Sequence, residues 1–362
     1  MRVLFFCADA ISGPVRIVPL LEALRITREL ESYSLVDRNM AINSSGSAFD
    51  VLVVHRNPSE RQFAWLRRSE LPFLYDIDDL LLSNSGDLTG RRAREHDAIR
   101  WCLNNAQFVT SPSHHLLTTL NGRVGNQLGL RARYLPNTGL GQIATREPAD
   151  RPTLLWVSSH GQDYEEFHEV AAGVAAAARV IGTKVLLVGR FAPAVTDALA
   201  GARHVPWIEP RQFRSFLSES SFIAAAPMPV ELARHEQEFV DCKSDIKAAQ
   251  YSSLGIAGVY SPALPYRKSD LPCRLARSNS ATDWQLALVQ LAREYPNAGS
   301  ALALDPAVTA RRPEFIAREL LGILQNVREK TGSPFDFRAI ATPAVFRRIE
   351  QMLRSLRSRL SS

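Results

Sequence analysis

Two lysines and a glutamine between residues 243 and 250 have the types and spacing of an anion-binding site. Lys243, Lys247 and Gln250 stand at i, i+4 and i+7, so on a helix they share one face. A cation in the first turn is unfavourable beside the positive end of the helix dipole, unless an anion is bound there. The backbone N–H groups of Ser244 and Asp245 would add hydrogen-bond donors. We therefore predict a phosphate-binding helix that begins near Lys243.

The length of this segment also fits a nucleotide. At about 1.5 Å per residue, Gln250 lies roughly 10 Å from Lys243 along the axis, about the reach from a diphosphate to a ribose hydroxyl. The chain has only five lysines, and two of them fall in this one segment. The alternative is that both lysines are solvated and that Ser244 is only an N-cap.

Three carboxylates, Asp76, Asp78 and Asp79, follow an apolar run that reads as a buried strand. Open α/β sheets bind their ligands at the carboxyl ends of strands. Crowded carboxylates repel one another unless they bind a cation, a substrate hydroxyl or nearby arginines. Oxygen ligands of this kind would also suit Mg²⁺, and the alternative for Asp76 or Asp79 is a cap on the following helix or turn. We expect the group to have a functional role.

Small residues at the ends of two other expected strands would let a ligand approach the backbone. Gly13 follows the first strand of the chain, and Ser158, His160 and Gly161 follow a strand expected at 153–157. His160 has no obvious carboxylate partner in the sequence. Gly139 begins a formal match to the dinucleotide fingerprint. Prolines interrupt the helix that should follow and no acidic residue ends the next strand, which argues against a nicotinamide or flavin enzyme.

Buried-strand runs alternate with amphipathic helices along most of the chain, which is typical of parallel α/β sheets. In the first part we predict strands at 2–7, 50–56, 72–77, 107–110 and 133–135, and helices at 15–30, 59–69, 91–104 and 113–121. In the second part we predict strands at 153–157, 184–188, 222–226 and 256–261, and a helix at 163–181. The polar segment 142–152, with its two prolines, is the expected linker. The fold class is therefore α/β, with two facing Rossmann-like domains at 1–145 and 146–335.

Residues 336–362 form a third predicted element, a C-terminal amphipathic helix. An apolar stripe runs from Val345 to Leu360, and five arginines occupy much of the remaining helix surface. We expect the stripe to pack back on the first domain. The alternative is that it lies on an anionic membrane.

Size and composition describe a soluble protein of two domains that handles anionic ligands. The 362 residues exceed what one core usually supports. The net charge of +6 fits phosphorylated substrates or an anionic membrane surface and does not indicate nucleic acid. The four cysteines are scattered, so we expect neither a disulfide framework nor structural zinc. We predict a cytoplasmic protein, with peripheral contact at the inner face of the membrane as the open alternative.

Several short stretches, in this order along most of the chain, resemble bacterial glycosyltransferases of the GT-B fold, and among them the retaining family 4. In the first domain the resemblance rests on residues 75–79 (YDIDD), 108–113 (FVTSPS) and 134–137 (YLPN). In the second domain it rests on residues 186–189 (LLVG), 205–208 (VPWI), 243–247 (KSDIK) and 254–257 (LGIA).

The resemblance implies that the second domain binds a nucleotide-sugar donor linked to UDP or GDP. Trp207 and Ile208 would lie by the base, and Gln250 by the ribose. Lys243 and Lys247 would neutralise the diphosphate as the glycosidic bond breaks, so that no metal or other cofactor is obligatory. Asp78 is the third expected catalytic residue. The expected donor-side residues are Ser158, His160, Gly161, Gly189, Arg190, Trp207, Ile208, Ser244, Asp245 and Gln250.

The same resemblance implies that a glycan, glycolipid or protein acceptor approaches the first domain. It would pass Gly13, Arg16, Asp76 and Asp79. An oxocarbenium-like transition state is expected, as in glycoside hydrolysis.

One position departs from the family pattern, because the residue that matches Gln250 is normally a glutamate there. A glutamine can hydrogen-bond a ribose hydroxyl but cannot supply the charge-assisted bond of a carboxylate. Together with the basic tail, this departure keeps open the alternative of a catalytically silent GT-B module that binds a sugar or a partner enzyme. A sugar-nucleotide epimerase of related fold is a further alternative, and it would need acid–base carboxylates and a histidine in the cleft.

Overall fold

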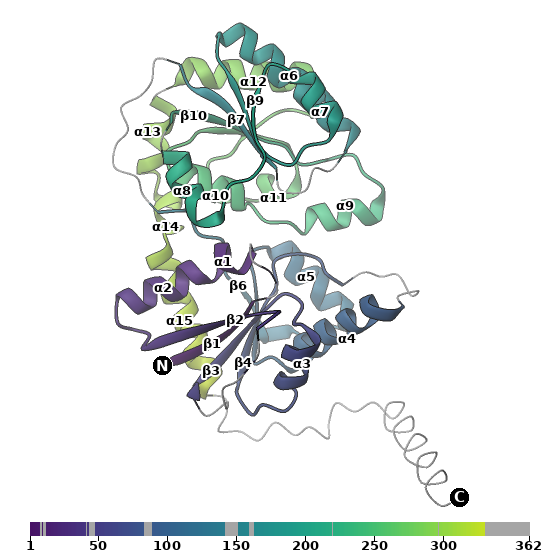
Figure 1. The fold of residues 1–362 in the computed structure, drawn as a ribbon, viewed down its shortest axis with the longest axis vertical. Helices are drawn as coiled ribbons and strands as arrows, with labels where there is room; N and C mark the ends of the chain where they lie inside the picture. Colours follow the sequence, from purple (N-terminus) through teal and green to yellow (C-terminus); the bar gives the residue numbers. More distant parts are fainter. Residues whose placement is uncertain are drawn as a thin grey trace, which may run out of the picture. The chain divides into compact units, whose positions relative to one another are not determined.

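In this computed structural model, the chain folds into two β-sheets that are flanked by helices (Figure 1). The structure describes residues 1–7, 9, 12–40, 42, 48–82, 89–141, 151–158, 163–218, 220–295 and 297–329. Each sheet has six strands, and every strand pair is parallel. We call the part that carries strands β1–β6 the N-terminal half and the part that carries β7–β12 the C-terminal half. The predicted α/β class with two Rossmann-like units is confirmed.

The first sheet has the strand order β2-β1-β3-β4-β5-β6. Its strands are β1 (Arg2–Cys7), β2 (Ser32–Asp37), β3 (Val51–His55), β4 (Phe73–Asp76), β5 (Phe108–Ser111) and β6 (Ala132–Tyr134). All but β2 lie where the apolar runs predict a strand. Strand β2 was missed because it pairs on one side only and is partly exposed, so it carries no continuous apolar run.

The helices of the N-terminal half are α1 (Ser12–Arg16), α2 (Val18–Ile26), α3 (Glu60–Leu66), α4 (Gly90–Asn105) and α5 (His114–Arg123). A short 3₁₀ turn, η2 (Gly129–Arg131), precedes β6. The single helix predicted at 15–30 is wrong, because the chain forms two helices with a break at Ile17. Pro19 lies in the first turn of α2, where the missing N–H of a proline is tolerated, whereas inside a longer helix it would break the hydrogen-bond ladder.

The second sheet has the order β12-β11-β10-β7-β8-β9. Its strands are β7 (Thr153–Ser158), β8 (Val185–Gly189), β9 (Arg203–Val205), β10 (Phe222–Ala226), β11 (Gly258–Tyr260) and β12 (Arg274–Leu275). The strands β7, β8, β10 and β11 were predicted. The two edge strands, β9 and β12, were not, since they are three and two residues long and partly exposed.

The helices of the C-terminal half include the long pair α6 (Glu165–Ile181) and α12 (Ala281–Glu294). Gly173 lets these two pack closely, because a Cβ there would lie 2.5 Å from the carbonyl oxygen of Ala281. The other helices are α7 (Pro193–Ala198), α8 (Pro210–Ser218), α9 (Arg234–Asp241), α10 (Ile246–Ser253), α11 (Leu264–Arg267), α13 (Asn297–Leu304) and α14 (Pro306–Ala310).

The last described helix, α15 (Pro313–Glu329), returns to the first sheet. Its apolar face, with Ile316, Leu320 and Leu324, shares a buried cluster with Val3 and Phe5 of β1. Figure 1 shows this yellow-green helix beside the strands of the N-terminal half. Within the described residues, the chain has thus already crossed back to the first sheet by residue 313. Residues 142–150 of the linker expected at 142–152, the boundary at 335 and the helix expected at 336–362 lie outside the described residues, and these three calls stay predictions.

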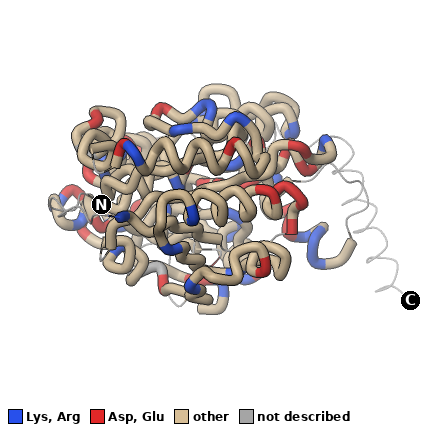
Figure 2. Tube along the Cα trace, turned by 90° about the horizontal axis from the view of Figure 1, so that it is seen from above, with Lys and Arg blue, Asp and Glu red and all other residues tan. Residues whose placement is uncertain are grey.

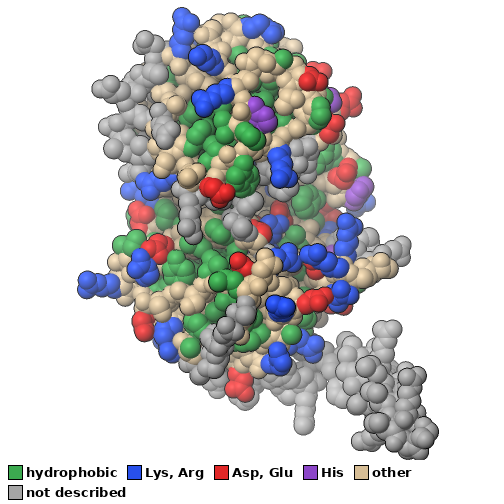
Figure 3. Space-filling view, in the orientation of Figure 1, with side chains coloured by type: hydrophobic (Ala, Val, Ile, Leu, Met, Phe, Trp, Pro, Cys, Tyr) green, Lys and Arg blue, Asp and Glu red, His purple; other side chains and the backbone are tan. Residues whose placement is uncertain are grey.

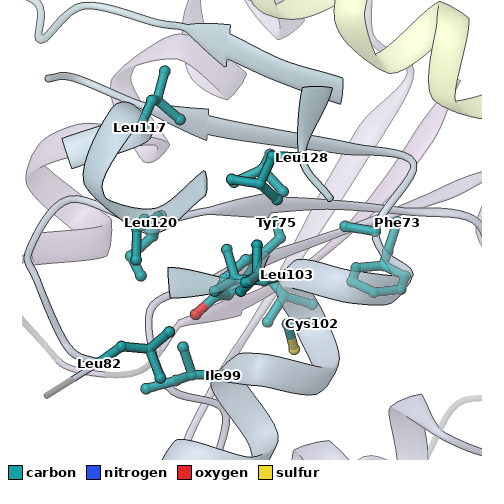
Figure 4. Packing of buried hydrophobic residues seen from close by; sticks show 14 of the residues in the cluster. Phe73, Tyr75, Leu82, Ile99, Cys102, Leu103, Leu117, Leu120 and Leu128 are labelled. Carbon is teal, nitrogen blue, oxygen red and sulfur yellow. The ribbon is translucent and has the colours of Figure 1, made fainter. Parts of the chain in front are cut away.

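A second cluster of the N-terminal half packs behind β4, whose end carries the three carboxylates. It contains Phe73 and Tyr75 from β4, Cys102 and Leu103 from α4, and Leu120 from α5 (Figure 4). All five side chains are buried. The position of the carboxylates is therefore set by a packed core and not by a free loop.

Charged residues of both signs are spread across the trace of the described chain (Figure 2). Basic, acidic and hydrophobic side chains are interspersed on the face that Figure 3 shows. None of the described helices is long and apolar enough to cross a bilayer.

Candidate functional site

The strand order of each sheet reverses at one point, and this marks where ligands bind in open α/β sheets. In the first sheet the reversal lies between β1 and β3, and in the second it lies between β7 and β10. Adjacent strands at such a point lead their chains to opposite faces, which leaves room for a ligand at their carboxyl ends. The side chains at these four strand ends are therefore the first candidates.

Lys247 lies at the reversal point of the second sheet. Its ammonium donates a hydrogen bond of 2.9 Å to the carbonyl oxygen of Val157, near the end of β7. Burial, and to a smaller extent the neighbouring Lys243, lowers the pKa of Lys247 to about 8. A partly buried ammonium beside a second cation is poorly stabilised, so a bound anion would relieve both effects.

Lys243 lies outside the helix, so its predicted place in the first helical turn is wrong. Helix α10 begins at Ile246 with Asp245 as its N-cap, and Lys243 belongs to the link that follows α9. The alternative in which Ser244 is the N-cap is wrong for the same reason. Lys247 does lie in the first turn, and Gln250 follows one turn later on the same helix.

The side chain of Lys243 connects the two halves of the protein. Its ammonium lies 3.5 Å from Oδ1 of Asp79 and 4.4 Å from the centre of the Phe239 ring. Asp79 also accepts a hydrogen bond of 2.7 Å from Arg56, at the end of β3. A residue predicted on the donor side thus meets one predicted on the acceptor side.

Asp76 is the buried centre of a polar network in the N-terminal half. Its carboxylate accepts two hydrogen bonds from Arg16, of 2.8 and 2.7 Å, and one of 2.6 Å from Thr110. His55 Nδ1 lies 2.8 Å from Oδ2 of the same carboxylate. Burial alone would raise the pKa of Asp76, but Arg16 and His55 hold it well below its usual range. Arg16 and Asp76 are both buried, so in this conformation neither is open to an acceptor.

Asp78 differs from its neighbour, because burial raises its pKa in spite of the nearby cations. Its Oδ1 lies 3.2 Å from Nε of Arg56, and its Oδ2 lies 3.9 Å from Nε2 of His55. Among the described residues, Asp78 Oδ1 has no hydrogen-bond partner. A carboxyl group with a raised pKa beside a histidine has the character of an acid or base, which suits the predicted catalytic role of Asp78.

The prediction from sequence missed His55 and Arg56, which follow the apolar run of β3. Arg56 adopts a left-handed backbone with φ of 59°, a conformation that is uncommon for a residue other than glycine. Its guanidinium contacts Asp9, Ser12, Asp78 and Asp79. The available signal was the position of two polar residues directly after a buried strand, next to the reversal point.

Three predicted donor-side residues meet at the ends of β7 and β8. The carbonyl oxygen of Ser158 accepts a hydrogen bond of 3.0 Å from the N–H of Arg190. Gly189 has a φ of 102°, and a Cβ there would lie 1.8 Å from the same oxygen. The close packing of two strand ends therefore explains Gly189 without a ligand. His160 and Gly161 lie outside the described residues.

The remaining predicted residues serve several structural roles. Trp207 is 45% exposed after β9, and its indole donates to Glu209, while Ile208 is partly buried against the core of the C-terminal half. The Asp245 carboxylate accepts hydrogen bonds from Ser269 and Arg311 and is buried. A Cβ at Gly13 would lie 2.2 Å from the sulfur of Cys7, so packing against β1 requires this glycine.

Glu166, in the first turn of α6, was also missed by the sequence reasoning. Its carboxylate accepts hydrogen bonds from the backbone N–H groups of Val230 and Glu231, at 3.0 and 2.8 Å, and from the amide of Asn279 at 2.5 Å. These bonds hold the segment after β10, on the other side of the reversal point from Lys247. No periodic pattern distinguishes such a residue from an ordinary acidic residue of a first turn.

The structure as a whole is similar to several solved structures. A glycosyltransferase from Rickettsia africae has a TM-score of 0.60 at 10% identity, over 90% of this chain and 98% of that one. A proposed UDP-N-acetylglucosamine 2-epimerase from Listeria monocytogenes has a TM-score of 0.56 at 13% identity, over 93% and 99%. Anabaena HepE, in complex with UDP and glucose, has a TM-score of 0.51 at 13% identity, over 92% and 99%.

No protein-family model matches the sequence, and a search of curated protein sequences finds no similar one. Likeness at such low identity shows a common fold. The chain therefore has the two-sheet α/β architecture of GT-B-like proteins.

Proposed function

We propose that the protein is a glycosyltransferase that transfers a sugar from a nucleotide-diphosphate donor to a glycan, glycolipid or protein acceptor. The observation that carries the proposal is Lys247, a partly buried lysine with a lowered pKa at the reversal point of the second sheet, beside Lys243. One cation in the first turn of a helix and a second in the link that precedes it, at the place where such sheets bind ligands, suit a diphosphate.

The donor is the part of the substrate that the geometry supports best. Lys247 and the first-turn N–H groups of α10 would receive the diphosphate, with Gln250 one turn further along the helix. One similar structure, that of HepE, holds UDP and glucose. We therefore propose a uridine or guanosine diphosphate sugar, with Trp207 and Ile208 near the base.

The chemistry would be stabilisation of the leaving group. As the glycosidic bond breaks, negative charge grows on the diphosphate, and fixed cations and helix N–H groups stabilise that charge. Lys243 and Lys247 can supply the positive charge that this requires without a metal ion. We propose a retaining outcome on the strength of the family resemblance. On the acceptor side, Asp78 and Asp79 would orient a hydroxyl group at the end of β4.

Thermal unfolding with added nucleotides tests the donor site. UDP, GDP, ADP and dTDP are each added to the wild type, to Lys247→Met and to a control, Lys184→Met. Lys184 is an exposed lysine at the opposite, amino-terminal end of β8, so its loss removes the same charge far from the reversal point. A ligand at 100 times its Kd stabilises a protein by about 2.7 kcal/mol, which is a shift of several degrees.

We expect one nucleotide to raise the transition of the wild type and of Lys184→Met, but not of Lys247→Met. A shift that persists in Lys247→Met would remove the proposed site. Binding without sugar transfer to any acceptor would favour the silent binding module. That alternative is suggested by Gln250, which stands where the family normally has a glutamate.

A second candidate, a sugar-nucleotide epimerase, is favoured by one observation. The structure places His55 beside Asp76 and Asp78, an acid–base group that the sequence alone did not show. Epimerisation at C2 of the sugar breaks a carbon–hydrogen bond, passes the proton to a protein base and forms a new bond with a proton that has exchanged with solvent. Incubation with UDP-N-acetylglucosamine in D₂O distinguishes the two, because deuterium in recovered sugar supports the epimerase and its absence together with transfer supports the glycosyltransferase.

A further inference from the structure

Two buried arginines hold the segment that follows β6. Arg16, from the N-terminal half, donates to the carbonyl oxygen of Leu135 at 3.0 Å and to Oδ1 of Asn137 at 3.1 Å. Arg311 donates to the backbone oxygen of Asn137 and to the hydroxyl of Tyr134, both at 3.1 Å. Asn137 is therefore fixed by its side chain on one side and by its backbone on the other.

The side chain of Asn137 joins the Asp76 network to the predicted donor segment. Its Nδ2 donates a hydrogen bond of 2.7 Å to the Ser244 hydroxyl oxygen. The connected series therefore runs from the Asp76 carboxylate through Arg16 and Asn137 to Ser244, next to Lys243. Asn137 is 2% exposed, so water does not compete for these bonds.

The chemistry of the donors fixes the direction of every bond in this series. A guanidinium can only donate, so the amide oxygen of Asn137 must face Arg16 and its NH₂ group must face Ser244. The Ser244 oxygen is thus an acceptor in this bond, which leaves its own hydroxyl hydrogen free to be donated elsewhere. Among the described residues, the structure places no acceptor for that hydrogen.

We propose that Asn137 is a positioning residue that orients the Ser244 hydroxyl as a hydrogen-bond donor to the diphosphate of the nucleotide. This inference rests on the proposed function, because it requires that an anion occupies the site beside Lys247. Arg16, anchored on Asp76, prevents the amide of Asn137 from turning over. Hydrogen bonds in such a series polarise one another, so Ser244 becomes a stronger donor than an isolated serine.

The Asn137→Asp variant tests the direction of the bond while side-chain size is kept. A carboxylate still accepts from Arg16, but it can no longer donate to Ser244. The Ser244 hydroxyl would then donate to the carboxylate and turn away from the ligand. We expect the affinity for the nucleotide that binds the wild type to fall about tenfold, or about 1.4 kcal/mol.

A second substitution separates this effect from the new negative charge. Ser244→Ala is measured in the wild-type and Asn137→Asp backgrounds, with UDP and inorganic pyrophosphate as probes in calorimetry. In the wild type, loss of the hydroxyl should weaken both probes by about the same tenfold. In the Asn137→Asp background it should have no further effect, since that hydroxyl already faces the wrong group.

A matched control is Gln62→Glu, another buried amide changed to a carboxylate. Gln62 donates to the backbone oxygen of Val36 within the N-terminal half, so its change should lower the unfolding temperature without altering affinity for either probe. Equal losses of affinity from Ser244→Ala in both backgrounds, or unchanged affinity in Asn137→Asp, would overturn the proposed role of Asn137 but leave the proposed donor site in place. Failure of the wild type to bind any of the nucleotides or pyrophosphate would overturn the proposed donor site as well.

Discussion

Two charged groups at the ends of the two sheets, the Asp76 carboxylate in the N-terminal half and the Lys247 ammonium in the C-terminal half, are stabilised to very different degrees. In the N-terminal half, Asp76 is matched by Arg16 and His55, and Asp79 by Arg56. In the C-terminal half, Lys247 donates a hydrogen bond to the backbone oxygen of Val157 and has another lysine as its charged neighbour. A matched group needs no ligand, whereas a poorly matched one gains from it. The difference indicates that the anion belongs beside Lys247 and that Asp76 stabilises the fold around the acceptor side.

Removal of the Asp76 carboxylate should give the largest effect on stability. Asp76→Ala leaves Arg16 buried without its anion, and breaking a buried pair in this way typically lowers stability by about 3–5 kcal/mol. Urea unfolding measures the loss. Asp79→Ala, which removes a partly exposed carboxylate, is the control and should change stability by about 1 kcal/mol or less. Similar values for the two variants would show that Asp76 is not the structural centre of its network.

Replacement of Lys247 should instead change nucleotide affinity strongly and the free energy of unfolding little. Lys247→Met removes an ammonium that burial disfavours, so the free protein should be at least as stable as the wild type. Its affinity for the bound nucleotide should fall about 100-fold, or about 2.7 kcal/mol. Calorimetry and urea unfolding on the same samples separate the two quantities. A variant that is less stable and binds normally would contradict the assignment of Lys247 to the ligand.

The pH dependence of nucleotide binding should report the titration of Lys247. The bound diphosphate favours the ammonium form, and the free protein loses that proton with a pKa of about 8. Affinity is therefore full below pH 8 and falls as pH rises above it, by up to tenfold per pH unit, until the higher pKa of the complex is reached. A phosphate group with its second pKa of about 6 stays ionised throughout this range. Calorimetry from pH 7 to 10 should show this slope in the wild type, and Lys247→Met should be flat.

The smallest effect is expected from the ion pair that joins the halves. Asp79 competes with a phosphate for Lys243, so Asp79→Asn should tighten nucleotide binding, by about two- to fivefold, because pairs of this exposure contribute about 1 kcal/mol or less. A titration at low salt gives the largest difference. A weaker affinity in Asp79→Asn would mean that this carboxylate supports the donor site and does not compete with it.

Most of the fold could be predicted because buried parallel strands carry continuous apolar runs. The apolar run of β3 is such a signal, and the Ala-rich, amphipathic pattern of α6 is the corresponding signal of a helix. Both elements were predicted within two residues of their observed bounds. The edge strands β2, β9 and β12 could not be predicted in the same way, since an edge strand is partly solvated and its pattern is mixed.

The site was less predictable because its residues come from distant parts of the chain. The spacing of Lys243, Lys247 and Gln250 indicated an anion site, but the break between α9 and α10 was not visible, so Lys243 was placed inside a helix. The partners Arg16 and Asn137 are 121 positions apart, and Asn137 and Ser244 are 107 positions apart. No local periodicity encodes contacts of that kind.

The return of α15 to the first sheet has a consequence for how the protein is made. A ribosome releases the chain from its amino end, so β1–β6 emerge long before residues 313–329. Until then, Val3, Phe5 and their neighbours lack the helix that covers them. The first part to be synthesised is therefore completed by the last described helix. A ribosome that stalls before residue 313 would leave a nascent chain with an exposed apolar sheet face, which is a surface that chaperones bind.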